Sequence, residues 1–99
     1  MNMQAMLKQA QNLQKEMMKS QEAITNMTFN AENGLVKVTM KGNKKLEKVE
    51  ISKDSPLETD DIEMLEDMIL VAVNDALNQI DKITDEKMGK YTKSLPGLF

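Results

Sequence analysis

The dipeptide Asn33-Gly34 restricts the fold of this chain more than any other feature, because apolar and polar residues alternate on both sides of it. Alternation with a period of two indicates strands, and Asn-Gly suits the two positive φ angles of a type I′ hairpin turn. Such a turn places every apolar residue of the hairpin on one side of the sheet. The predicted cross-strand partners are Ala31 with Val36, Phe29 with Val38, and Met27 with Met40.

A second turn at Gly42 to Lys44 predicts a third antiparallel strand, with Leu46 opposite Met40. Continuing that register would set Val38 against Lys48, so we expect a β-bulge near Glu47-Lys48. The bulge restores three pairs: Val38 with Val49, Val36 with Ile51, and Lys37 with Glu50. The last pair offsets two opposite charges on the solvent face. The sequence therefore predicts a meander with strands at about 27–31, 35–41 and 45–52.

The segment before these strands predicts a long amphipathic helix at about 3–25. Its apolar seam follows alternating spacings of three and four residues, which is the pattern of one helix face. The seam consists of Met3, Met6, Ala10, Leu13, Met17, Ser20 and Ile24.

The segment after the strands predicts a second and longer helix at about 61–92, followed by a short tail at 93–99. Its apolar face consists of Ile62, Leu65, Ile69, Ala72, Ala76, Ile80 and Ile83, widened by Val73 and Leu77. Asp60 and Glu63 have the spacing of a capping box at its start. Pro96-Gly97 ends it.

These elements predict an α+β fold, namely one α-β-β-β-α domain that comprises residues 1–99 with an antiparallel three-stranded meander and two long helices. The second helix would be nearly ~50 Å long. Three short strands do not cover both helices along such lengths. Packing the helices as an antiparallel pair buries part of the excess, and we expect homodimerisation to bury the rest.

Composition excludes several classes of protein. The chain has no Cys and no His, so it has no disulfides, no zinc site of the usual kind, and no thiol or imidazole nucleophile. Carboxylates at helical spacing could bind a hard cation, but no nucleophile, base and oxyanion donor occur together. These carboxylates are those of Asp60, Asp61, Glu63, Glu66 and Asp67. We predict no enzyme activity, no metal, no cofactor and no small-molecule substrate.

The apolar residues also indicate where the protein resides. No apolar run approaches the ~20 residues that span a membrane, and the first residues do not follow the pattern of a secretory signal. We expect a soluble cytoplasmic protein without a membrane partner.

Charge is segregated along the chain although the net charge is only -3. Acidic residues gather between Asp54 and Asp67, and all 13 basic residues are Lys. Three lysine groups are candidates for phosphate contact: Lys8, Lys15 and Lys19; Lys41, Lys44, Lys45 and Lys48; Lys87, Lys90 and Lys93. The first group is also open to the interpretation of an ordinary solvated helix face, and the second to that of solvated residues without a ligand. If the helices lie antiparallel, Lys8 comes near the third group.

Four stretches resemble the YbaB/EbfC family of bacterial nucleoid-associated proteins, and together they cover nearly the whole chain. They are "MLKQAQNLQKEM", "GLVKVTMKGNKKLEKVEIS", "DIEMLEDMILVAVNDAL" and "LPGLF". The most specific parts are "GLVKVT" with the following Gly42, and "EMLEDMILVAVNDA". The resemblance implies a homodimer whose long helices project like tweezers. It also implies binding of double-stranded DNA with little sequence preference, in the bacterial cytoplasm at the nucleoid, and no catalytic site.

Two hypotheses for function follow. In the first, a dimeric architectural protein contacts DNA phosphates through the lysines named above, and the absence of Arg favours low sequence specificity, since Lys is a point charge. In the second, the apolar helix faces and ten methionines bind a partner protein without direct DNA binding.

Overall fold

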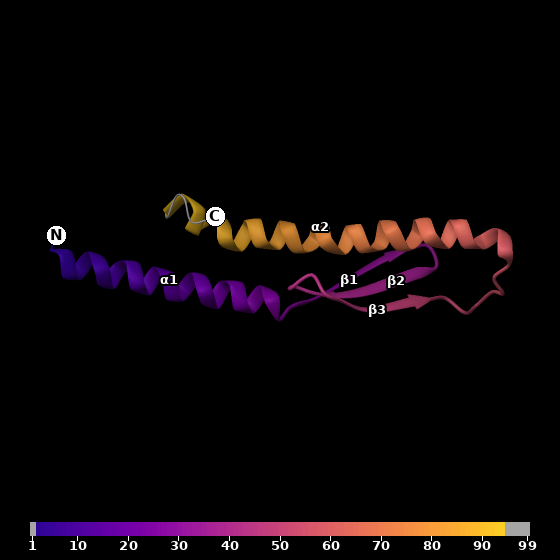
Figure 1. Cartoon of the computed structure of the whole chain (residues 1–99), viewed down its shortest axis with the longest axis horizontal. Coiled ribbons are helices and arrows are strands. Elements are labelled where there is room, and N and C mark those ends of the chain that lie inside the picture. Colours follow the sequence, from indigo (N-terminus) through magenta and orange to yellow (C-terminus); the bar gives the residue numbers. More distant parts are fainter. Residues whose placement is uncertain (1, 95–99) are drawn as a thin grey trace.

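The elements follow the order helix, three strands, helix. A computed structural model describes the backbone of residues 2–94 and the side chains of residues 2–91. Its elements are α1 (Met3–Thr25), β1 (Thr28–Asn33), β2 (Val36–Lys41), β3 (Leu46–Ile51), the short 3-10 helix η1 (Thr59–Asp61) and α2 (Ile62–Ser94). The strands form one antiparallel sheet in the order β1-β2-β3. The α+β fold with α-β-β-β-α order is thus confirmed, in a rod of 71 × 19 × 14 Å (Figure 1).

The first hairpin turns one residue later than predicted, which shifts the cross-strand register by two residues. Asn33 pairs with Val36, so the turn consists of Gly34 and Leu35, and only Gly34 has a positive φ, at 56°. The predicted register was therefore wrong: Phe29 lies opposite Met40 rather than Val38. Since the shift is two residues and side chains alternate with a period of two, the same residues still face the core.

Helix α2 explains the position of this turn. The backbone N–H of Leu35 donates to Sδ of Met68 at 3.4 Å. A Cβ on Gly34 would lie 2.5 Å from Cε of the same Met68. Contact with Met68, a residue far along the chain, thus favours glycine as the first residue of the turn. The alternation of apolar residues alone had predicted a turn at Asn33-Gly34.

The second hairpin confirms the predicted register and bulge. Met40 pairs with Leu46 and Thr39 with Lys48, so the register shifts between Thr39 and Met40 and leaves Glu47 without a partner. Beyond the bulge the pairs are Val38 with Val49, Lys37 with Glu50, and Val36 with Ile51. The turn itself uses a positive φ of 68° at Lys44.

The core lies between α2 and the first two strands. Ala72 and Ala76 are completely buried, and such small side chains let the helix approach the sheet closely. Around them pack Phe29, Ala31, Val36, Val38, Met40 and Ile80. Strand β3 shows no such burial: its first five residues are exposed and only Ile51 is partly buried. Helix α2 therefore covers β1 and β2 and leaves β3 open.

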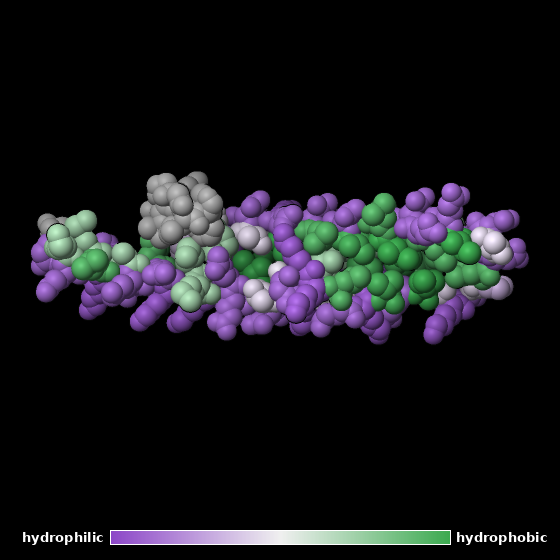
Figure 2. Space-filling view, viewed as in Figure 1, coloured by the Kyte–Doolittle hydropathy of each residue, from purple (hydrophilic) through white to green (hydrophobic). Residues whose placement is uncertain are grey.

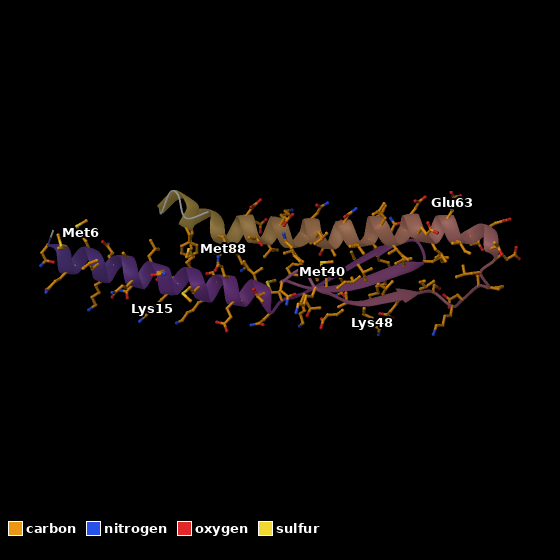
Figure 3. The ribbon with its side chains drawn as sticks, viewed as in Figure 1. Met6, Lys15, Met40, Lys48, Glu63 and Met88 are labelled. Atoms are coloured by element: carbon orange, nitrogen blue, oxygen red, sulfur yellow. The ribbon has the colours of Figure 1, made fainter. Side chains whose placement is uncertain are left out.

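A second, smaller cluster joins the end of α1 to the last turns of α2. It contains the buried residues Ile24, Met88 and Tyr91, with Leu13 and Met17 packed against them. Figure 3 shows Met88 between the two helices. The hydroxyls of Ser20 and Tyr91 are hydrogen-bonded at 3.2 Å, which aligns the antiparallel helices. The first turns of α1 extend past this cluster (Figure 1).

The caps of the helices differ from the sequence prediction in one place. Asn2 caps α1 by accepting a hydrogen bond from Ala5 N–H at 2.8 Å. The capping box predicted at Asp60 was wrong: Glu58 N–H donates to the Asp61 carboxylate at 2.9 Å, and Asp60 lies within η1. The predicted stop at Pro96-Gly97 falls outside the described residues.

Two glycines provide a test of this packing. A Cβ on Gly42 would collide with the backbone carbonyl of Ile24 at the end of α1, whereas one on Gly89 would have no neighbour within 4 Å. We expect Gly42→Ala to lower the free energy of unfolding by about 2 kcal/mol through this clash. Gly89→Ala should raise it by about 0.5–1 kcal/mol, because alanine favours the helix.

Chemical denaturation at one fixed protein concentration measures both effects. Equal effects of the two substitutions would contradict the close contact between the second turn and α1.

Candidate nucleic-acid interface

The three lysines of α1 form an exposed stripe on the side turned away from α2. Leu13 and Met17 face α2 and are partly buried, whereas Lys8, Lys15 and Lys19 are exposed. At 100° per residue the lysines point roughly opposite to the apolar seam, and they cover about 16 Å of helix length. The ion pairs among the described residues involve none of the three. Their charges are available to a ligand.

The outer face of the sheet adds three more lysines. Lys37 and Lys41 alternate with the buried residues of β2, and Lys48 of β3 lies opposite Thr39 on the same face. Lys41 Nζ donates to Thr28 Oγ1 at 3.0 Å. Lys48 Nζ lies 3.6 Å from a carboxylate oxygen of Glu50. Lys37 was predicted to offset Glu50, and it does lie opposite in the register, but Lys48 makes the ion pair.

These two sets of lysines share one side of the rod, which we call the lysine face. In Figure 3, Lys15 on α1 and Lys48 on β3 both point away from α2. The lysine face consists of Lys8, Lys15, Lys19, Lys37, Lys41 and Lys48. Exposed pairs such as that of Lys48 contribute at most ~1 kcal/mol, so a phosphate can replace the carboxylate partner.

The remaining lysines of the second turn point elsewhere. Lys44 Nζ lies 3.2 Å from the Asp81 carboxylate on α2, so its charge is offset on the opposite side of the molecule. Lys45 is exposed, and its backbone N–H donates to Asn43 Oδ1 at 3.0 Å. The structure thus divides the four turn lysines, which the sequence placed in one group.

Lys87 and Lys90 flank a shallow groove between the helices. The groove is lined by Ser20, Ala23, Glu86, Lys87 and Lys90. Lys90 Nζ also lies 5.0 Å from the centre of the Tyr91 ring, a cation–π distance. The side chain of Lys93 lies outside the described residues.

The prediction that Lys8 approaches this third group was wrong. The Ser20–Tyr91 hydrogen bond aligns the C-terminal half of α1 with the end of α2. Lys8 is twelve residues before Ser20 and so lies about 18 Å farther along the helix. Lys19, next to Ser20, is the lysine of α1 whose turn faces Lys87 and Lys90.

The sequence reasoning missed Lys37 as a member of the lysine face. Period-two alternation in "KVTMK" could have found it, since Lys37, Thr39 and Lys41 point to the same side of β2. Lys37 was left out of the candidate groups because its predicted pairing with Glu50 already explained its charge.

Acidic residues occupy the far end of the molecule. Glu63 stands near the start of α2, at the end opposite to α1 (Figure 3). Carboxylates in the first turn of a helix interact favourably with the positive end of its dipole, which accounts for their position. No three acidic side chains within residues 2–94 come together in a way that could hold a metal ion.

Of the part of the chain that the structure describes, neither helix combines enough length with enough apolar character to cross a bilayer.

The fold and the lysine face define an elongated α+β protein with one lysine-rich side and one acidic end. The model of the YbaB/EbfC DNA-binding family matches residues 1–95. The chain therefore belongs to the YbaB/EbfC family, which is a DNA-binding family and not a family of enzymes.

Known proteins with similar sequences or folds agree with this assignment. Nucleoid-associated protein LL0120 of Lactococcus lactis subsp. lactis (strain IL1403) is 50% identical over 98 residues, which cover 97% of this chain and 98% of that protein. A nucleoid-associated protein of Ligilactobacillus salivarius (strain UCC118) is 45% identical over 100 residues, or 99% and 95% of the two chains. The crystal structure of the uncharacterized protein HP0035 from Helicobacter pylori shares the fold, with a TM-score of 0.71 and 17% identity over 87% of this chain and 91% of that one.

Proposed function

We propose that this protein is a nucleoid-associated protein that binds double-stranded DNA as a homodimer, with little sequence specificity, through contacts between lysines and phosphates. The observation that carries the proposal is the exposed stripe of Lys8, Lys15 and Lys19, which the described ion pairs leave free. Family membership supplies the ligand class. The relatives named as nucleoid-associated support a location at the nucleoid in the bacterial cytoplasm.

The residue types favour phosphate contact over base recognition. All 13 basic residues are Lys, and an ammonium group is a point charge without the planar fork that grips guanine. Phosphate contacts position a protein on the duplex but carry no sequence information. Low sequence specificity follows from a lysine face of this kind.

Salt dependence gives the first test. If a dimer contacts on the order of 4–8 phosphates, log affinity should fall with log salt at a slope of about -4 to -7. We expect Lys8→Gln with Lys15→Gln to make that slope shallower by about 2–4, since each dimer loses four charges. Fluorescence anisotropy with a random-sequence duplex measures the slope.

The matched control is Lys53→Gln with Lys82→Gln. It removes the same number of charges from exposed lysines outside the three candidate groups. We expect a much smaller change of slope. If both double variants weaken binding equally, only net charge matters and the lysine face is not the interface.

The homodimer is supported by an open apolar surface beside β3. Leu46 and Val49 occupy core-facing positions of β3 yet remain 44% and 40% exposed, because α2 covers only β1 and β2. Leu57, before α2, and Ile62, the first residue of α2, are 40% and 52% exposed. Figure 2 shows apolar side chains gathered over the half of the molecule that holds the sheet. A second copy would bury this surface on both chains at once.

Two exposed valines test this interface. Val49 lies on the open face of β3, whereas Val71 lines a polar groove on the other side with Glu32, Asn33, Asn74, Asp75 and Asn78. We expect wild type and Val71→Asp to have twice the 11.2 kDa chain mass by light scattering. Val49→Asp should move the mass toward one chain, because it buries an unpaired charge in the dimer.

A wild-type mass equal to one chain would contradict the homodimer. It would favour the alternative function, in which the same apolar surface binds a partner protein. Dissociation of Val71→Asp but not of Val49→Asp would place the interface elsewhere.

A further inference from the structure

Strand β1 is an edge of the sheet, and its outward backbone groups can be identified. Just before the strand begins, the backbone N–H of Gly42 donates to the carbonyl of Met27 at 2.9 Å. Residues of an antiparallel ladder alternate between bonding the partner strand and pointing away from it, so every second residue of β1 points outward. The N–H and C=O groups directed to the free edge belong to Thr28, Asn30 and Glu32.

One of these outward groups already has a side-chain partner on α2. Gln79 Nε2 donates to the backbone carbonyl of Asn30 at 3.0 Å. This contact supports the assignment, because a carbonyl bonded within the ladder would face β2 instead. The hydrogen bonds of the described residues include no such partner for the backbone of Thr28 or Glu32. The edge of β1 is therefore largely open.

The two edges of the sheet differ in their protection against strand addition. Natural edge strands avoid pairing with other chains by means of lysines, prolines or bulges. Strand β3 has a bulge at Glu47 and carries Lys48. Strand β1 reads Thr-Phe-Asn-Ala-Glu-Asn, without lysine or proline, and its register with β2 is unbroken. Strand β1 is thus the edge that can accept an added strand.

A polar groove adjoins this edge, where α2 runs along β1 (Figure 1). Neither Glu32 nor Asp75 in its lining takes part in an ion pair among the described residues, and no lysine of that part of the chain lines it. Val71 is 49% exposed and offers an apolar contact. The groove, which we call the edge groove, has a volume of about 450 Å³ and is lined by Glu32, Asn33, Val71, Asn74, Asp75 and Asn78.

We propose that the free edge of β1 and the edge groove form a docking site for a basic, extended segment of a partner protein. The segment adds to the sheet as a further strand, and its backbone bonds the outward groups of β1. Its lysine or arginine side chains meet Glu32 and Asp75. The same two carboxylates disfavour a nucleic acid as the occupant. The site does not depend on DNA binding by the lysine face.

A synthetic peptide of alternating lysine and valine is the probe. We expect fluorescently labelled Lys-Val-Lys-Val-Lys-Val-Lys to bind the whole chain saturably, as measured by fluorescence anisotropy. A matched peptide with methylated central backbone amides keeps the charge and the side chains but loses hydrogen-bond donors. It should bind at least roughly tenfold more weakly. Equal affinity of the two peptides, or no saturable binding of the first, would overturn the proposal.

Two substitutions distinguish docking in the edge groove from general attraction to an acidic protein. Asp75→Asn should weaken binding of the first peptide roughly fivefold. Asp85→Asn removes the same charge from an exposed position outside the groove and should change the affinity less than about twofold. Equal weakening by the two substitutions would overturn the proposal.

Gln79→Ala tests the backbone edge itself. It frees the carbonyl of Asn30 for the peptide and should tighten binding roughly fivefold, about the effect of one hydrogen bond. Alanine suits the helix, so α2 is retained. Attraction by charge alone would leave the affinity unchanged, and that result would overturn the proposal.

Hydrogen exchange read by NMR locates the bound peptide. The peptide should slow exchange of the backbone amides of Thr28, Asn30 and Glu32 by roughly tenfold or more, and it should leave the amides of β3 unchanged. Protection at β3, or at neither edge, would contradict the proposal. Protection of the same β1 amides that grows with protein concentration in the absence of peptide would mean that a second copy occupies the edge, and the proposal would fail.

Discussion

The packing of α2 across β1 and β2 is the contact on which the rest of the molecule depends. The helix has 33 residues and the strands have six each, so the helix is much longer than the surface it covers. Its middle turns use the fully buried Ala72 and Ala76 to approach the two strands, and its last turns use Met88 and Tyr91 to hold α1. One helix thus organises both apolar clusters and leaves β3 outside them.

The same packing determines where charge can accumulate. Since α2 occupies one face of the sheet, the polar face of β2 and β3 is directed to the other side, together with the outer side of α1. Lysines from elements far apart in the sequence therefore line one side of a 71 Å rod, while a separate cluster of carboxylates lies around the start of α2. A net charge of -3 conceals this division. Such an arrangement attracts a polyanion along one side only.

The features predicted well from the sequence are those set by local periodicity. Element order, the buried face of β1 and β2 and the bulge at Glu47 follow from the periodicity of apolar residues, and the structure confirms them. The position of the first turn could not be predicted from this periodicity, because it depends on the contact between Gly34 and Met68 of α2. The neighbours of Lys8 could not be predicted from the sequence either. Periodicity shows which face of a helix is apolar, but not how far one helix is shifted along the other. That offset depends on single contacts such as Ser20 with Tyr91.

The most direct test of the account is a lysine-acetylation footprint of the protein with and without a random-sequence DNA duplex, read by mass spectrometry. The account predicts that DNA slows acetylation of Lys8, Lys15, Lys37 and Lys48 and leaves Lys53 and Lys82 unchanged. Uniform protection of all lysines, or protection confined to Lys53 and Lys82, would contradict the claim that the lysine face binds DNA.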